Sequence, residues 1–299
     1  MRNTFIESLV VHARKDEKIA LIVGDLGYSV VEPFAEEFPG RFVNAGIAEQ
    51  NMTGIAAGMA SEGYHVFTYS IANFPLFRCA EQIRNDVDYH NLPVTVVSVG
   101  GGLAYGNLGY SHHAVQDFAL VRSMPNMLIA APGDPMEMSA CMSFLVENKQ
   151  PSYLRINKSG EPNIHQSTPL LTCGGVKILK NLNNCRKLIL TTGAVLELAH
   201  SIWDEHERIR SDWAIGSMPL WSEKSRDIIF NQLNEYEEIV VIEEHLLAGG
   251  FCSFLLESGL KIQPFYLNND VCGAVGHQSY LLREYGLNRT LIYDYLMNT

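Results

Sequence analysis

Short, nearly continuous runs of apolar and β-branched residues recur along this 299-residue chain and alternate with stretches of helical periodicity. Uninterrupted apolar runs are typical of parallel strands buried on both faces, and their alternation with helices is typical of an α/β layered fold. In the first half, the predicted strands cover 18–25, 65–70, 93–99 and 126–132, and the predicted helices cover 2–14, 48–62, 76–90, 115–123 and 134–148. This half is therefore predicted to form a parallel sheet covered by helices.

A second series of strands and helices follows a polar stretch, residues 157–169, that contains two prolines. Proline favours loops and linkers over regular structure. Beyond it, the predicted strands cover 186–193, 211–218, 237–245 and 261–268, and the predicted helices cover 194–209, 222–235, 249–259 and 277–285. We therefore predict two parallel-sheet α/β layered domains, residues 1–165 and 166–299, each long enough to bury its own core.

The charge balance and the cysteines exclude several classes of function. The chain has 22 Lys and Arg against 33 Asp and Glu, a net charge of −11, and no basic run, so no nucleic-acid partner is expected. No apolar run approaches the roughly 18 residues that a membrane span needs, and the N-terminal stretch lacks the apolar block of a signal peptide. The six cysteines form no CxxC pair or zinc spacing, which indicates reduced, mostly buried thiols of a cytosolic protein and no metal site on this chain.

One carboxylate, Glu49, begins a predicted helix that is otherwise built mainly from small and apolar residues. Residues 47–63 read IAEQNMTGIAAGMASEG. An acid in the first turn is favoured by the helix dipole, by roughly 0.3–1 kcal/mol, and on position alone this structural explanation is preferred. Small residues, however, allow close packing against backbone or a flat ligand, and a surface helix of this length normally carries more charge. Glu49 is therefore also a candidate functional group.

A glycine-rich loop follows the predicted strand that ends at Val99, with five glycines within residues 100–109. Glycine permits positive φ and close approach of the backbone to a ligand, and open parallel sheets place ligands at the carboxyl ends of their strands. The loop is neither a P-loop nor a GxGxxG turn. It ends in Ser111-His112-His113, where adjacent side chains point to opposite faces, so one histidine is expected to face a given ligand. A hydrogen-bonded structural role is the alternative for each.

Aromatic and cationic side chains gather near the same strand ends. Tyr69, Phe74 and Phe77 lie where a predicted strand gives way to a helix, and they suit either a core or the wall of a site for a flat ring. Arg78 follows them, and Arg155 lies near a lysine in the last strand-like run of the first half. This arginine and lysine suit an anion, although a solvated loop fits the sequence equally well, and for Arg78 a surface pair is the more common role.

In combination, these features resemble the transketolase family of thiamine-diphosphate enzymes. The Glu49 helix, the glycine loop ending in histidine, the run SMPNMLIAAPGDPME (123–137) and the run VVIEEHLLAGGF (240–251) occur in the order that the family shows. The resemblance covers nearly the whole chain and is to the C-terminal half of these enzymes. It implies a pyrimidine-binding domain followed by the transketolase C-terminal domain.

The resemblance implies cofactor-binding and catalytic roles. Glu49 would hydrogen-bond N1′ of the aminopyrimidine of thiamine diphosphate and share the proton that leads to the ylid, while the cofactor serves as electron sink. Tyr69 and Phe74 match the positions that stack on the pyrimidine. Phe77 is a rival for this position, because the alignment requires an insertion before the following arginine. His112 matches the histidine that reaches the substrate and the developing alkoxide.

The resemblance also implies substrate contacts. His113 lies beside His112, and Arg78 and Arg155 match positions near the phosphate end of the substrate in relatives. Asn107 stands where relatives carry the acid of an Asp-Gly pair, which reads sugar hydroxyls. Because that acid is absent, we expect a different or larger sugar than pentose-phosphate enzymes accept.

The motif that holds the cofactor diphosphate is not recognisable in this sequence. The family binds the diphosphate through Mg²⁺, held by a GDG motif and a downstream asparagine, whereas VGDLG (23–27) is interpreted here as a strand end and its turn. The resemblance therefore implies one subunit of a split transketolase in an α2β2 assembly. The site for thiamine diphosphate would be completed by an N-terminal partner chain, which would hold the diphosphate and Mg²⁺. A charged fraction of only 18% fits a large buried interface.

The implied reaction is transfer of a two-carbon ketol unit between sugars, with donor and acceptor unidentified. A β subunit of a 2-oxoacid dehydrogenase and a deoxyxylulose-phosphate-synthase-like enzyme are alternatives, and both would decarboxylate a 2-oxoacid first. The runs SIANFPLFRCAEQIRND and GGGLAYGNLGYSHH favour the split transketolase. A catalytically silent scaffold is the alternative from another class. No catalytic role is expected for Glu243, Glu244 and His245, because the family's C-terminal domain is mainly structural.

Overall fold

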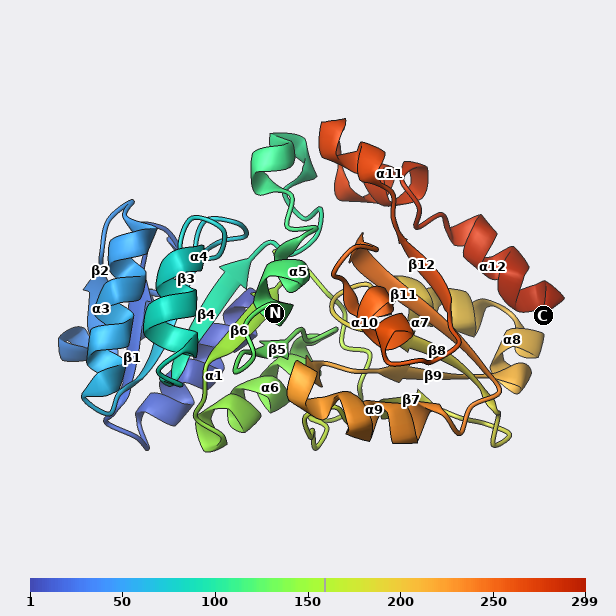
Figure 1. Cartoon of the computed structure of the whole chain (residues 1–299), viewed down its shortest axis with the longest axis horizontal. Coiled ribbons are helices and arrows are strands. Elements are labelled where there is room, and N and C mark those ends of the chain that lie inside the picture. Colours follow the sequence, from blue (N-terminus) through green and yellow to red (C-terminus); the bar gives the residue numbers. More distant parts are fainter. Residues whose placement is uncertain (159) are drawn as a thin grey trace.

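The computed structural model describes residues 1–158 and 160–299, which form two β-sheets with helices packed against them (Figure 1). The first half contains helices α1 (Arg2–Ala13), α2 (Glu32–Glu37), α3 (Glu49–Ser61), α4 (Ala80–Gln82), α5 (Asp117–Arg122) and α6 (Pro135–Glu147), and strands β1 (Ile19–Val23), β2 (Phe42–Asn44), β3 (His65–Ile71), β4 (Val94–Val99), β5 (Leu128–Ala130) and β6 (Ser152–Ile156). The second half contains strands β7 (Lys177–Lys180), β8 (Lys187–Thr191), β9 (Trp213–Ser217), β10 (Leu220–Trp221), β11 (Glu238–Leu246) and β12 (Gln263–Leu267), and helices α7 (Leu196–Glu205), α8 (Glu207–Asp212), α9 (Arg226–Leu233), α10 (Phe251–Glu257), α11 (Gln278–Glu284) and α12 (Arg289–Asn298). A π-helical segment, η2 (Ile83–Asp88), continues α4, and two 3₁₀ turns, η3 (Gly106–Leu108) and η4 (Tyr110–His112), lie between β4 and α5.

Both sheets confirm the predicted α/β layered fold, although neither is purely parallel. The seven-stranded sheet has the order β10-β5-β6-β4-β3-β1-β2, and the five-stranded sheet has the order β12-β11-β8-β9-β7. The two exceptions to parallel pairing are the edge strands β10 and β7, which run antiparallel to their neighbours β5 and β9. An antiparallel strand at the edge of a parallel sheet is common, because an edge position does not require a crossover helix.

Burial on both faces explains why the apolar runs located the central strands. Every residue of β1, β4 and β6 is buried. Alternate strand residues enter two separate clusters, so that Leu21 packs with α1 and α6 on one face and Ile22 packs with α3 and η2 on the other. The parallel sheet is therefore the middle layer of three.

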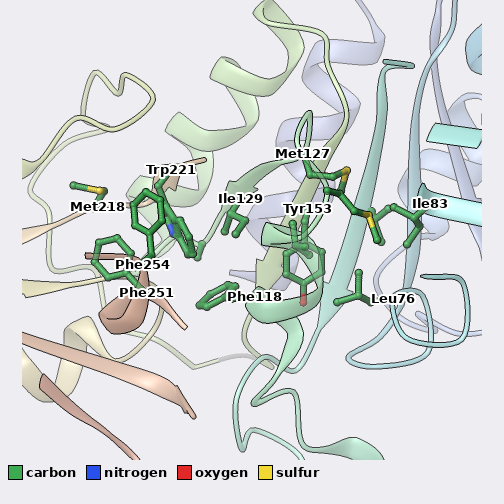
Figure 2. Packing of buried hydrophobic residues seen from close by; sticks show 14 of the residues in the cluster. Leu76, Ile83, Phe118, Met127, Ile129, Tyr153, Met218, Trp221, Phe251 and Phe254 are labelled. Carbon is green, nitrogen blue, oxygen red and sulfur yellow. The ribbon is translucent and has the colours of Figure 1, made fainter. Parts of the chain in front are cut away.

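A strand from the second half completes the first sheet. Strand β10 pairs with β5 through Leu220 opposite Ala130 and Trp221 opposite Ile129. The buried Trp221 ring has its centroid 5.3 Å from that of Phe118, and it also contacts the rings of Phe251 and Phe254 from α10 (Figure 2). Its indole N–H donates to Thr192 Oγ1 at 3.2 Å. One hydrophobic cluster thus joins the two halves of the chain.

Differences from the predicted elements concern short or irregular segments. The predicted helix over 76–90 is shortened to α4 and the π-helical segment, and the helix over 194–209 is divided at His206, whose backbone is extended. Strands β2, β7 and β10 and helices α2 and α12 were not predicted. The domain boundary at residue 165 lies between β6 and β7 and stays a prediction.

Two further findings concern the chain as a whole. No helix in the described part of the chain has both the length and the apolar character that crossing a membrane requires. All six cysteines are free thiols; Cys79, Cys141 and Cys252 are buried and the other three are partly exposed.

The junction around Trp221 gives a stability prediction. Replacing Trp221 by Ala is expected to lower the free energy of unfolding by about 3–5 kcal/mol, because it removes a fully buried ring from the shared cluster. Trp221→Phe, which keeps one ring but loses the bond to Thr192, is expected to cost less. Urea unfolding followed by circular dichroism measures both. Equal, small losses for the two variants would contradict the role assigned to this ring.

Candidate functional site

Glu49 is the first residue of α3, and its side chain is turned inward. The residue is 2% exposed, and its Oε2 accepts a hydrogen bond from Arg78 Nη1 at 2.7 Å. A Cβ added to Gly24, the residue after β1, would lie 3.5 Å from both Glu49 Cγ and Ser70 Oγ. Glu49 therefore lies against the carboxyl ends of β1 and β3, the edge at which open parallel sheets place ligands.

Arg78, Phe74 and His112 extend this group toward the surface. The Arg78 guanidinium lies over the Phe74 ring, with Cζ 4.8 Å from the ring centroid, and the Arg78 side chain is 46% exposed. The ring of Phe74 meets that of His112 edge-on, with centroids 5.2 Å apart. The structure thus brings together four of the predicted site residues, Glu49, Arg78, Phe74 and His112.

The turn between β3 and α4 is held from both sides. Gln50 Nε2 on α3 donates to the carbonyl of Arg78 at 3.0 Å. Asn73 Nδ2 donates to the carbonyl of His113 at 2.7 Å. Phe74 is therefore fixed between the helix that carries Glu49 and the loop that carries His112.

The two adjacent histidines differ in access. His112 is partly exposed, its Nδ1 lies 2.9 Å from Ser111 Oγ, and partial burial lowers its pKa. His113 is fully buried, with Nε2 3.4 Å from the carbonyl oxygen of Gly106, and burial lowers its pKa as well. Only His112 is open to a ligand here, and His113 lies inside the loop.

Tyr69 and Phe77 lie outside this group. Tyr69 is 1% exposed, and its ring stacks on Phe5 of α1 at 5.7 Å, within the cluster on the opposite face of the sheet. It has no free face for a flat ligand in this structure. Phe77 is 43% exposed, in the turn before α4. Of the three predicted aromatic residues, Phe74 is the one that contacts His112 and, through Arg78, is linked to Glu49.

Arg155, predicted to lie near a substrate phosphate, is bonded to protein groups in this structure. Its side chain is 8% exposed, and Nη2 donates to the carbonyl oxygens of Ala114 at 3.0 Å and Glu244 at 2.8 Å. Its Nε lies 3.4 Å from a carboxylate oxygen of Asp117. The guanidinium therefore donates its hydrogen bonds to protein acceptors at the junction of the two halves. Asn107 is exposed, and its Nδ2 lies 3.4 Å from Nδ1 of His277 in the second half.

The glycines of the loop are required by protein packing. Gly102 has a φ of +62°, and a Cβ at this position would lie 2.3 Å from Glu244 Cδ. A Cβ at Gly101 would lie 2.3 Å from Arg155 Nε. The close approach that the glycine-rich sequence predicted is thus made, at these two positions, to charged side chains of the protein itself.

Glu243, Glu244 and His245 of β11 are all buried and bonded within the protein. Glu243 accepts hydrogen bonds from the first N–H groups of α10, at 2.6 and 2.9 Å, and burial raises its pKa to about 7. Glu244 accepts from Leu103 N at 2.8 Å. The His245 ring stacks on Phe118 at 5.2 Å, and burial lowers its pKa to about 4. No group of three or more His, Cys, Asp or Glu side chains in the described part of the chain is arranged to hold a metal ion.

Comparisons with known proteins agree on one family. Residues 1–162 match the family described as transketolase, pyrimidine binding domain. The chain is 32% identical to a transketolase C-terminal section from Methanocaldococcus jannaschii, covering 96% of this chain and 92% of the relative. It is 29% identical to a 1-deoxy-D-xylulose-5-phosphate synthase from Geobacter metallireducens, covering 95% of this chain and 46% of the relative. The solved structure of a split gene transketolase, described as an inactive beta4 tetramer, has a TM-score of 0.85 and 28% identity, and the match covers 99% of this chain and 96% of that one.

The burial of Glu243 makes stability depend on pH. Its pKa is about 7 in the folded chain and near the ordinary 4.5 when unfolded, so between these values the folded state holds a proton that the unfolded state releases. The wild type is therefore expected to lose stability relative to Glu243→Gln as pH rises from about 4.5 to 7, by at most roughly 1.4 kcal/mol per pH unit.

Urea unfolding of both proteins at a series of pH values measures this difference. Glu137, whose pKa burial also raises to about 7, is present in both proteins and cancels in the comparison. A difference between the two proteins that does not change with pH would contradict the assignment.

Proposed function

Because the chain belongs to the transketolase family and carries its pyrimidine-binding domain, we propose that it is one subunit of a split, thiamine-diphosphate-dependent transketolase. The complex transfers a two-carbon ketol unit between sugars, and a partner chain supplies the diphosphate-binding domain with its Mg²⁺. The observation that carries this proposal is the buried carboxylate of Glu49 at the carboxyl edge of the first sheet, grouped with Phe74 and His112.

The residues present fit the pyrimidine end of the cofactor. A protonated ring nitrogen requires a carboxylate in a place shielded from water, which Glu49 offers. Ser70 Oγ is buried beside it and has no hydrogen-bond partner among the described residues. The Phe74 ring supplies a partly accessible apolar face. The diphosphate end finds no matching set, because no metal-holding group is present in the described residues. This asymmetry supports a site completed by a second chain.

Each residue of the group has a role that follows from its chemistry. Thiamine diphosphate, when bound, supplies a centre that stabilises a carbanion. Glu49 would hold a proton toward the pyrimidine nitrogen, and the Phe74 ring would limit the position of the pyrimidine by contact. His112, whose lowered pKa keeps its imidazole largely neutral at neutral pH, can donate a hydrogen bond to a substrate oxygen or accept one. Arg78 competes for the Glu49 carboxylate, and because it is half-exposed it can turn toward an anionic substrate instead.

The comparisons support the need for a partner. The chain spans 46% of the Geobacter metallireducens 1-deoxy-D-xylulose-5-phosphate synthase that it matches, and the structurally similar β4 tetramer of a split gene transketolase is described as inactive. We propose an α2β2 assembly with the active site between the chains.

The chain alone with thiamine diphosphate and Mg²⁺ is expected to show no turnover, and addition of the partner is expected to restore it. Substantial activity without the partner would contradict the split arrangement.

A decarboxylating enzyme is the second candidate, and the 29% identity to the Geobacter metallireducens synthase favours keeping it. Both candidates use Glu49 in the same way but differ in the donor. Release of CO₂ from pyruvate by the complex would establish the synthase-like reaction, whereas ketol transfer from a ketose without CO₂ would establish the transketolase reaction.

Substitution of Glu49 tests the proposed function. In the complex with the partner chain, Glu49→Gln is expected to lower kcat by about 100-fold or more, because the amide cannot hold the shared proton. The matched control is Glu62→Gln, an exposed acid that follows the other end of α3. Steady-state kinetics with each variant, and calorimetric titration with thiamine diphosphate, provide the measurements. Wild-type turnover in Glu49→Gln would favour a silent scaffold.

A further inference from the structure

The loop that carries His112 is attached to the second half of the chain. This loop, residues 100–114, connects β4 to the segment before α5 and includes the turns η3 and η4. It lies between the first sheet and α11, so that segments far apart in sequence are neighbours there (Figure 1). Its conformation therefore depends on contacts that residues 1–165 cannot supply alone.

The first contact is made by Glu244 of β11. Its Oε1 accepts hydrogen bonds from the backbone N–H of Leu103 and from Nε2 of Gln278, both at 2.8 Å. Glu244 is 7% exposed, and Gly102 leaves just enough room for its carboxylate. A charge-assisted bond in a buried setting is among the stronger hydrogen bonds in proteins. Glu244 therefore fixes the start of the loop.

The base of the loop is joined to the same strand. Gly102 and Ala114 exchange two backbone hydrogen bonds, of 3.0 and 2.8 Å, which close the loop into a ring. Arg155 Nη2 bonds the carbonyl oxygens of Ala114 and Glu244 together. The side chain of Glu244 thus holds one end of the loop, and its backbone, through Arg155, holds the other.

The middle of the loop also contacts the second half. Gly276 N, just before α11, donates to the carbonyl oxygen of Gly106 at 3.2 Å. Gln278, which bonds Glu244, is the first residue of α11. Glu244, Gln278 and Gly276 therefore form one continuous support beneath the two turns that end at His112.

From this arrangement we infer that Glu244 is a positioning residue of the site, and that the second domain acts on the reaction by holding the His112 loop. Glu244 bonds Leu103 and Gln278, and no hydrogen bond to the Glu49 group is present among the described residues, so its effect on the site passes through the backbone of residues 102–103. Its kinetic consequence rests on the proposed function, whereas its effect on the loop does not.

Hydrogen exchange measured by mass spectrometry on the chain tests the structural part. Glu244→Ala is expected to speed exchange across residues 100–114, and Glu244→Gln, whose amide oxygen can still accept both bonds, is expected to restore most of the protection. Glu243→Ala is the matched control, because Glu243 is also buried on the same strand but bonds α10. It should speed exchange near residues 251–255 and leave the loop unchanged. If Glu244→Ala folds poorly, Gln278→Ala removes one of the two bonds and should give a smaller change in the same loop.

Kinetics of the complex with the partner chain test the functional part. Glu244→Ala is expected to lower kcat by about 10- to 100-fold, the range that displacement of a positioned group produces. Affinity for thiamine diphosphate should fall less than kcat, because Glu49 keeps its contacts and Phe74 loses only the support that the loop gives it. Glu243→Ala should keep the wild-type kcat per folded molecule.

Unchanged exchange in residues 100–114 of both Glu244→Ala and Gln278→Ala would overturn the inference, as would an equal loss of kcat in the Glu243→Ala control. A wild-type complex that transfers no ketol unit would instead refute the proposed function, and the exchange result would stand by itself.

Discussion

The guanidinium of Arg155 is the buried charge on which the arrangement of the two halves depends. A buried charge that loses its partners is strongly destabilising, so the surrounding groups must be arranged to meet it. Here those partners are the carbonyl oxygens of Ala114 and Glu244 and the carboxylate of Asp117, which belong to the loop base, β11 and α5. Satisfying one side chain thus fixes three elements from both halves of the chain.

The apolar contacts act in the same direction. Phe118 on α5 receives the Arg155 guanidinium on its ring, with Cζ 4.5 Å from the centroid, and also packs against Trp221 and His245. Because Trp221 belongs to a strand of the first sheet and packs on α10 of the second half, polar and apolar interactions meet at the same junction. The halves therefore behave as one packed unit, although the sequence divides them by a linker.

Sequence reasoning located the central strands because burial on both faces leaves an unbroken apolar run. Because both faces are apolar, the sequence does not indicate which face of the sheet each side chain joins. Tyr69 and Phe74 are both aromatic residues near a strand end, but Tyr69 points to α1 and away from Glu49. Edge strands β2, β7 and β10 are short and carry no such run, so nothing in the sequence marked them. The contact between Leu103 and Glu244 joins residues 141 positions apart, and only the folded backbone brings them together.

The buried position of Glu49 favours a chemical role for this carboxylate over a stabilising charge at the start of a helix. A favourable helix dipole and a pair with a half-exposed arginine are both available to an exposed acid as well. Burial of a carboxylate adds a desolvation cost that an exposed position avoids. A stabilising role therefore does not account for a carboxylate that is 2% exposed. Local rules that are broken without a gain in stability tend to mark functional sites, and this supports assigning the buried position of Glu49 to chemistry.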